Sequence, residues 1–369
     1  MKQILFISRN LACPNYHGGC VYPYRLLEAL AAAGMLIHYL WLPQSLPNRP
    51  FRLPFRPAFA ERVSVIGATA VGSFFIKNSF RSGNTTASIR SILRHGPPAE
   101  VILDYLWDAK LLHDLPARTW VLTHELIHQR AESYLQAGAT PDFTVLNEAQ
   151  EIELLSNADG LIAIQDEDGA WMQTHFPQKE VVVLPLPCKR KTLPTAAVSP
   201  LSVLFIGGKT AHNRYGLEWL ANEVWPQVIA EIPDARLRIY GTVSTDGLPL
   251  LESIEVRGPV LDVADAYSQN HVAAVPLRFG SGLKIKLLEA MAYGLPAVAT
   301  PVGAQGFAEL RQGSICPVCE HAREFAGALV RLLTDVAFRT NIVTRQDEWL
   351  ERATAPAQLA ERFCCAIAD

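Results

Sequence analysis

The sequence lacks the signatures of several large protein classes. Neither of the first strands expected in its two halves, at residues 4–8 and 201–206, is followed by a P-loop pattern or a GxGxxG dinucleotide pattern. The longest apolar stretch, residues 26–43, is interrupted by Glu28, Gly34 and His38, which predicts a helix, a turn and a strand rather than a membrane span. No secretory signal is evident at the start, so we expect a cytoplasmic protein.

Cysteine and charge are also sparse. Seven cysteines, an odd number, are expected to be reduced thiols, and the pair Cys316 and Cys319 lacks the second pair of ligands that zinc requires. The run Asp166 to Asp168 imitates an acidic metal motif, but acids are favoured in a first helical turn, so no metal is expected. With 49% hydrophobic and 19% charged residues, the 369-residue chain is predicted to form two cores.

Strand-like and helix-like segments alternate in both halves of the chain. Buried-strand patterns occur at residues 4–8, 36–42, 99–106, 119–123 and 160–164, and again at 201–206, 234–240, 271–277 and 295–300. This alternation predicts an α/β fold of two Rossmann-like domains with parallel sheets. Residues 184–200, rich in Pro, Thr, Ser and basic residues, are typical of a linker. We therefore predict an N-terminal domain at 1–190 and a C-terminal domain at 198–349.

The most informative segment is residues 279–301, FGSGLKIKLLEAMAYGLPAVATP, in which a glycine loop leads into a helix. Strand patterns on both sides make it a βαβ unit, and Gly294 is expected to end the helix. At about 100° per residue, one side of this helix is apolar and the other carries Lys286 and Glu289. The apolar side holds Leu283, Leu287, Ala290 and Met291. Because unpaired N–H groups at the helix start favour anions, the segment is a candidate phosphate site.

This segment resembles the C-terminal signature of the retaining nucleotide-sugar glycosyltransferases of family 4, in which a glycine loop precedes a helix ending LLEAMAxGxPVVAT. The resemblance implies the glycosyltransferase-B fold: two Rossmann-like domains facing each other across a cleft, with residues 350–369 packing back on the N-terminal domain. It also implies that Glu289 holds the ribose hydroxyls and that Gly280, Ser281 and Gly282 give backbone N–H groups to the donor. Many members carry a second Glu at the position of Ser281, and this chain departs from them there.

The resemblance implies roles for residues elsewhere in the chain. In the segment 207–216, GGKTAHNRYG, we expect Lys209 and Arg214 on a loop that contacts the diphosphate, although Tyr215 stands where many members have Lys. His124 and Glu125 follow a strand end, where members direct a His toward the donor sugar and the acceptor. The other donor-binding candidates are Gly18 and Gly19 in the first-strand loop, Asn213, Arg257 and Val260 near the base, and Lys286.

The implied activity is the retaining transfer of a sugar from a nucleotide diphosphate sugar to a hydroxyl acceptor, in cell-surface polysaccharide or glycolipid biosynthesis. The family reaction uses no protein nucleophile, and we expect neither a metal nor a further cofactor. One alternative is a noncatalytic nucleotide-sugar-binding partner or regulatory protein of the same fold, which Ser281 and Tyr215 motivate. A sugar-nucleotide epimerase or a phosphorylase of this architecture is a third.

Basic and aromatic residues concentrate between positions 49 and 94. This stretch holds eight Lys and Arg residues, one acid and six Phe residues. The mixture suits an anionic membrane surface, where a lipid-linked acceptor would be found, and it also suits a solvated basic face over core aromatics. Peripheral docking at the inner face of a membrane is therefore one hypothesis. No nucleic-acid recognition module accompanies the charge, so we expect no nucleic-acid partner.

Overall fold

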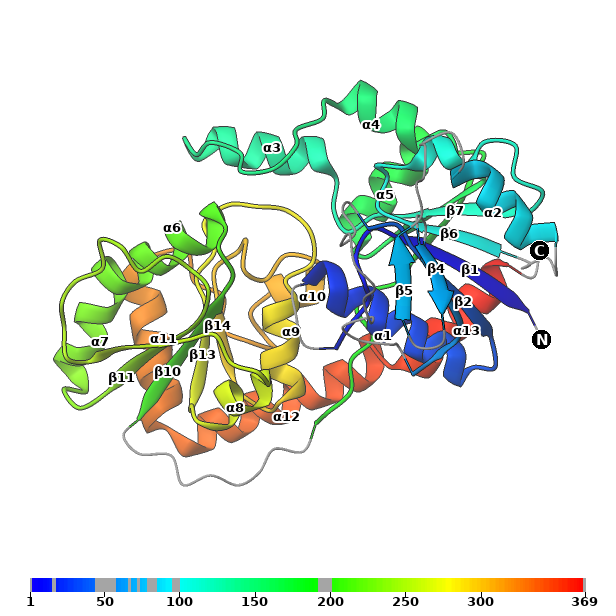
Figure 1. Ribbon diagram of the computed structural model, residues 1–369. Helices are drawn as coiled ribbons and strands as arrows, with labels where there is room; N and C mark the ends of the chain where they lie inside the picture. The colour runs from blue at the N-terminus through cyan, green and yellow to red at the C-terminus, as the bar shows by residue number, and fades with distance from the viewer. Residues whose placement is uncertain are drawn as a thin grey trace. The chain divides into compact units, whose positions relative to one another are not determined.

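The computed structural model describes residues 2–14, 18–43, 58–65, 68–71, 74–77, 85–94, 100–191 and 201–367. They form two compact α/β units, both visible in Figure 1. Unit 1 comprises Met1–Glu125, Asn147–Pro187 and Pro356–Asp369, and unit 2 comprises Leu126–Leu146 and Cys188–Ala355. The chain therefore passes between the units four times. The second part of unit 2 begins near the expected boundary at 190–198, but residues 126–146, which we expected in the N-terminal domain, belong to unit 2.

Unit 1 is built on a seven-stranded sheet in the order β3-β2-β1-β6-β7-β8-β9, in which neighbouring strands pair in parallel. Its strands are β1 (Gln3–Ser8), β2 (Leu36–Trp41), β3 (Ala60–Val65), β6 (Glu100–Asp104), β7 (Arg118–Leu122), β8 (Gly160–Ala163) and β9 (Glu180–Val183). The central strands are buried along nearly their whole length, as the continuous apolar runs predict for a sheet covered on both faces. All the strand patterns expected in the N-terminal half are confirmed.

Helices and one small hairpin complete unit 1. They are α1 (Gly18–Ala32), α2 (Thr85–Arg94), the 3-10 turn η2 (Ala109–Leu112), α4 (Glu148–Leu155), α5 (Asp166–His175) and the hairpin of β4 (Ala68–Val71) with β5 (Phe74–Lys77). The C-terminal helix α13 (Pro356–Ala366) belongs to unit 1, whereas residues 350–355, which the resemblance also assigned to the N-terminal domain, belong to unit 2. Its Phe363 ring lies edge-on to Trp120, and Arg362 donates to the Val183 carbonyl at 2.9 Å.

Unit 2 contains a five-stranded parallel sheet in the order β12-β11-β10-β13-β14. Figure 1 labels β11, β10, β13 and β14 of this sheet. The strands are β10 (Ser202–Gly207), β11 (Arg236–Gly241), β12 (Ile254–Gly258), β13 (Val272–Val275) and β14 (Ala297–Ala299). Side chains alternate between the two faces, so that Leu237 and Ile239 enter the main core with Phe205, Trp225 and Phe325. Four of the helices of unit 2 are α8 (Val263–Ser268), α10 (Ala308–Arg311), α11 (Ala322–Thr334) and α12 (Val336–Ala353).

The helical stretch after β10 begins earlier than the sequence suggested. Helix α6 (Ala211–Trp219), a π-turn η3 (Leu220–Val224) and α7 (Trp225–Glu231) follow one another, whereas we expected a loop up to Gly216. Gly216 is inside α6 and serves close packing, because a Cβ atom there would lie 2.7 Å from the Pro276 carbonyl oxygen. Arg214, expected on a loop, is therefore on a helix.

The predicted βαβ unit is confirmed. β13 and β14 pair in parallel, and α9 (Ile285–Ala292) connects them and ends before Gly294, which has a φ of +68°. All four side chains of the predicted apolar side are buried, whereas Lys286 and Glu289 are half-buried. The helix therefore presents its polar side where the sequence placed it.

In the described part of the chain, no helix combines the length and the apolar character needed to cross a bilayer. Much of the basic and aromatic stretch at 49–94 lies outside the described residues.

Candidate donor-binding site

The glycine loop before α9 is held by a lysine that the sequence analysis did not single out. Lys284 is 7% exposed, and its ammonium donates to the carbonyl oxygens of Ser281 at 2.6 Å and Gly282 at 2.8 Å. A third contact reaches Gln305 Oε1 at 3.4 Å. Gly280 and Gly282 have φ angles of +120° and +73°, which side chains other than glycine rarely adopt. Loop shape is therefore set by two glycines and one buried cation.

Lys286 lies in the first turn of α9, next to the glycine loop. Its ammonium donates to Oδ1 of Asn213 and lies 5.4 Å from the centre of the Phe205 ring. Burial and the charge of Lys284 lower the pKa of Lys286 to about 7, against the opposing pull of Glu289. A positive charge is thus costly here without a ligand, and an anion would stabilise it. Asn213 is buried and also donates to the Gly208 carbonyl, so two predicted donor residues meet.

Glu289, the predicted ribose ligand, lies beside a buried tyrosine. The hydroxyl of Tyr267 is 3.4 Å from Glu289 Oε2 and 3.5 Å from the Lys286 carbonyl oxygen. The Tyr267 ring stacks on Tyr293 with a centroid distance of 4.8 Å. Burial, together with the Glu289 charge, raises the pKa of Tyr267 well above its usual value, so the phenol stays protonated and can donate.

Residues 126–146 pack on the glycine loop, although they follow β7 in the sequence. Ser133 Oγ in α3 (Ile127–Gln136) accepts from the Gly280 N–H at 2.9 Å. The Tyr134 ring lies edge-on to Phe279, 4.7 Å between centroids, in a small cluster that also includes Ala139. Asp142 accepts from the Ala211 N–H at the start of α6, 2.8 Å away. No local sequence pattern indicates this contact, because its two sides are more than 60 residues apart.

The Tyr134 hydroxyl also fixes His212 on α6. It lies 2.8 Å from His212 Nδ1, while Nε2 of the same ring is 3.2 Å from Thr210 Oγ1. Burial lowers the pKa of His212 to about 2, assisted by the charges of Lys286 and Lys284. The imidazole is therefore neutral at any physiological pH and acts as a hydrogen-bonding spacer.

The two residues predicted to contact the diphosphate from the β10 loop are more exposed than those near α9. Lys209 lies on the exposed turn before α6. Arg214 forms an ion pair with Glu218 one helical turn later, at 2.7 Å, and its guanidinium stacks over Tyr215. Lys286 rather than Arg214 therefore contacts Asn213. The lysine that contacts the glycine loop is Lys284, directly before α9.

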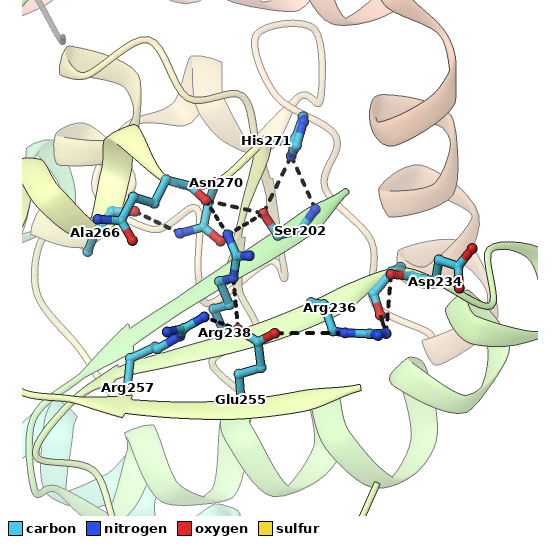
Figure 2. Close-up of polar contacts among 11 residues, drawn as sticks. Ser202, Asp234, Arg236, Arg238, Glu255, Arg257, Ala266, Asn270 and His271 are labelled. Atoms are coloured by element: carbon cyan, nitrogen blue, oxygen red, sulfur yellow. Dashed lines mark hydrogen bonds and ion pairs between the residues drawn. The ribbon is translucent and has the colours of Figure 1, made fainter. Parts of the chain in front are cut away.

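Arg257 and Val260 were expected near the base. Figure 2 shows Arg257 turned toward Glu255 within β12, where Arg238 and Arg236 from β11 converge on the same carboxylate. Although burial opposes it, hydrogen bonds from Arg257 and Arg238 lower the pKa of Glu255. Val260 is half-buried, two residues beyond Gly258. Arg257 thus serves an ionic network on the edge strand, and the structure does not bring it to Glu289.

In unit 1 a buried histidine and aspartate pair lies where neighbouring strands end. His124 Nε2 is 2.6 Å from Asp104 Oδ1, and Ser8 Oγ donates to Asp104 Oδ2 at 2.6 Å. These residues follow or end β7, β6 and β1, which are neighbours in the sheet. The Tyr105 ring stacks on the imidazole at 4.1 Å, and Tyr105 has a φ of +65°, rare outside glycine. Strain of this kind is concentrated at functional sites.

The remaining predicted residues in unit 1 are less closely gathered. Glu125 is half-buried beside His124. Burial raises the pKa of Asp168 to about 7, and the charge of Glu125 adds to that increase. Gly18 and Gly19 were expected in a loop but are the first two residues of α1. The run Asp166 to Asp168 was expected in a first helical turn, and these acids occupy the first turn of α5, after Gln165 at the cap position. Among the described residues, no group of His, Cys, Asp and Glu could hold a metal ion.

Comparison with known proteins adds a family match in unit 2. Residues 200–335 match the family model described as "Glycosyl transferases group 1". One curated relative, an uncharacterized 44.6 kDa protein in the cps region of Klebsiella pneumoniae, is 28% identical over 173 residues. That alignment covers 42% of this chain and 42% of the relative's length.

Solved structures match over the whole chain. TarM of S. aureus, solved with UDP, has a TM-score of 0.72 at 11% identity, covering 100% of both chains. Sucrose-phosphate synthase of Thermosynechococcus elongatus has a TM-score of 0.71 at 17% identity, covering 99% of this chain and 98% of its own. WaaG, a glycosyltransferase involved in lipopolysaccharide biosynthesis, has 0.63 at 15%, covering 99% of both. At these identities the likeness shows the fold, and it confirms the predicted α/β architecture with parallel sheets.

Proposed function

We propose that this chain, a member of the group 1 glycosyltransferases with the glycosyltransferase-B fold, retains anomeric configuration while transferring a sugar from a nucleotide diphosphate sugar to a hydroxyl acceptor. The observation that carries the proposal is the gathering of Lys286, Asn213 and the glycine loop after the carboxyl ends of β10 and β13. From β10 the chain continues to β11, and from β13 it continues to β14, so the two connections run toward opposite edges of the sheet. Ligands of open α/β sheets bind at such switch points.

The donor side of the reaction follows from the charges at this point. Cleavage of the sugar–phosphate bond leaves negative charge on the nucleotide diphosphate, and a preorganised cation and N–H groups stabilise that charge. We assign this role to Lys286 and the N–H groups of the glycine loop. Since these supply the positive charge, we propose that the reaction needs neither a metal nor another cofactor. Glu289 is assigned to the ribose hydroxyls.

The acceptor side is assigned to unit 1. The Asp104 carboxylate beside Nε2 fixes the orientation of the ring, so Nδ1 of His124 is left to accept a hydrogen bond from a substrate. In the retaining reaction the leaving phosphate takes the acceptor proton. His124 would then orient the donor sugar or the acceptor hydroxyl rather than act as the main base.

The substrate class is proposed from the relatives. Among the similar structures, TarM is named in complex with UDP, and WaaG is named for lipopolysaccharide biosynthesis. We therefore propose a uridine diphosphate sugar as donor and a cell-surface glycan or lipid-linked precursor as acceptor. The reaction would then occur in the cytoplasm, at the inner face of a membrane. Binding to vesicles of anionic lipid, compared with neutral vesicles, tests the last point.

A transfer assay tests the activity. Purified protein would be incubated with UDP-glucose, UDP-galactose, UDP-GlcNAc or GDP-mannose, with and without membrane extract and in the presence of a chelator. We expect release of nucleotide diphosphate by the wild type with one donor, and none by Glu289→Ala. If a donor binds tightly but its nucleotide is never released, the result favours the alternative hypothesis of a noncatalytic nucleotide-sugar-binding protein.

A further inference from the structure

Two carbonyl groups of the glycine loop are turned toward one buried side chain. The Lys284 ammonium binds the carbonyl oxygens of Ser281 and Gly282, which belong to consecutive peptide groups. A buried ammonium needs such partners, because an uncompensated charge in the interior is costly. Both carbonyls are therefore fixed on the Lys284 side of the loop.

Peptide geometry then fixes the direction of the next two N–H groups. In a planar trans peptide, the C=O of one residue and the N–H of the next point in opposite directions. The N–H groups of Gly282 and Leu283 must therefore point away from Lys284. Within the described chain neither N–H makes a hydrogen bond, although Gly282 and Leu283 are both buried. Adjacent N–H groups that point the same way form an anion-binding concavity.

We propose that Lys284 is a positioning residue for the donor diphosphate: by binding two loop carbonyls, it aims the N–H groups of Gly282 and Leu283 at the phosphate oxygens. This inference rests on the proposed function, because it takes the diphosphate as the anion. Lys284 itself faces the other side of the loop. Its task differs from that of Lys286, whose ammonium reaches Asn213 and is assigned to the phosphate directly.

Two variants separate positioning from charge. Lys284→Met removes the ammonium and keeps the length of the side chain, and Lys286→Met removes a neighbouring charge without freeing the loop carbonyls. Lys110→Met, at an exposed lysine of unit 1, controls for charge loss alone. The Gly280 N–H, bonded to Ser133, reports on loop order without any ligand.

The first measurement is hydrogen–deuterium exchange of peptides spanning residues 277–284 in the free protein. We expect Lys284→Met to accelerate exchange about 10-fold, since the loop loses its anchor, and the two other variants to exchange like the wild type. Equal rates in Lys284→Met and wild type would overturn the positioning role. An equal acceleration in Lys110→Met would do the same.

The second measurement is binding of UDP and of uridine, with GDP and guanosine as a second pair. We expect Lys284→Met to weaken diphosphate binding about 30-fold, from two misdirected charge-assisted hydrogen bonds, and nucleoside binding less than twofold. Glu289→Ala should weaken both. Unchanged diphosphate affinity in Lys284→Met overturns this inference alone. A wild type that binds none of the four compounds overturns the donor assignment, and this inference with it.

Discussion

His124 Nε2 lies 2.6 Å from Oδ1 of Asp104, and both side chains are almost completely buried at the point where β6 and β7 end. Ser8 occupies the second carboxylate oxygen, so Asp104 is fully engaged by two donors. A carboxylate placed in this way selects one tautomer of the imidazole and leaves Nδ1 for a substrate. The pair is therefore the best candidate for acceptor-side chemistry in unit 1.

The first prediction concerns this pair. Asp104→Asn keeps the size of the side chain but removes the charge that orients His124, so we expect the rate of sugar transfer to fall about 100-fold. Affinity for the nucleotide diphosphate should remain within twofold, because its proposed ligands belong to unit 2. Steady-state kinetics and nucleotide titration check both statements. A parallel loss of nucleotide affinity would contradict the division of labour between the two units.

The second prediction concerns stability and pH. Because the pKa of Lys286 is lowered to about 7 in the fold, the unfolded chain binds a proton between pH 7 and pH 10.5 that the folded protein does not hold. The contribution of Lys286 to the free energy of unfolding therefore rises with pH from about 7 to 10.5 and is constant at its lowest value below pH 7. Lys286→Met should flatten this dependence and raise the free energy of unfolding at pH 7 by ~2 kcal/mol. Urea unfolding at pH 6.5 and 9 measures the free energy of unfolding of both proteins. The prediction is refuted if this free energy changes equally with pH in the variant and the wild type.

A third prediction follows from the same side chain when the ligand is present. The diphosphate favours the charged form of Lys286, so binding should take up close to one proton at pH 8.5 and almost none at pH 5.5. Calorimetry in buffers with different ionisation enthalpies counts this proton. Lys286→Met serves as the control and should show no uptake from this group. If proton uptake is equal in the variant and the wild type, the proton binds to a group other than Lys286.

The fourth prediction concerns His212. Its pKa is lowered from 6.5 to about 2, so only the unfolded chain gains this proton as the pH drops. Stability from His212 is complete above pH 6.5 and should decline by ~1 kcal/mol for each pH unit below it. His212→Gln removes this decline, although the loss of the Tyr134 contact lowers stability at pH 7. The unfolding free energy between pH 4 and pH 7 decides the point, and the idea fails if both proteins lose stability equally.

Much of the donor-binding unit could be predicted from local sequence patterns. The βαβ unit follows from two short apolar runs around a helix with a clear apolar side, and its end follows from Gly294. Glu289 and Lys286 then share a face by helical geometry alone. These features depend on residues within about four positions of one another, which is the range over which periodicity carries information.

The rest depends on contacts between distant residues. In the sequence, Lys284 cannot be distinguished from an ordinary solvated lysine, because its burial depends on the carbonyls of the folded loop. Asp104 is the last residue of a strand and belongs to no recognisable motif. The membership of residues 126–146 in unit 2 rests on Ser133 and Tyr134, whose partners are about 150 and 80 residues away. Gly216 was misread for a related reason, since its close approach to Pro276 is a tertiary contact within a helix.

A calorimetric titration of UDP, and of GDP if UDP fails, into wild type and Glu289→Ala at pH 7 tests whether the nucleotide binds at α9. We expect saturable binding at one site in the wild type and a loss of affinity of about 100-fold in the variant, because the variant lacks the carboxylate that accepts the ribose hydrogen bonds. Melting temperatures of the two free proteins should agree, which excludes unfolding of the variant. Equal affinities for the two proteins, with both folded, would contradict the placement of the nucleotide at α9.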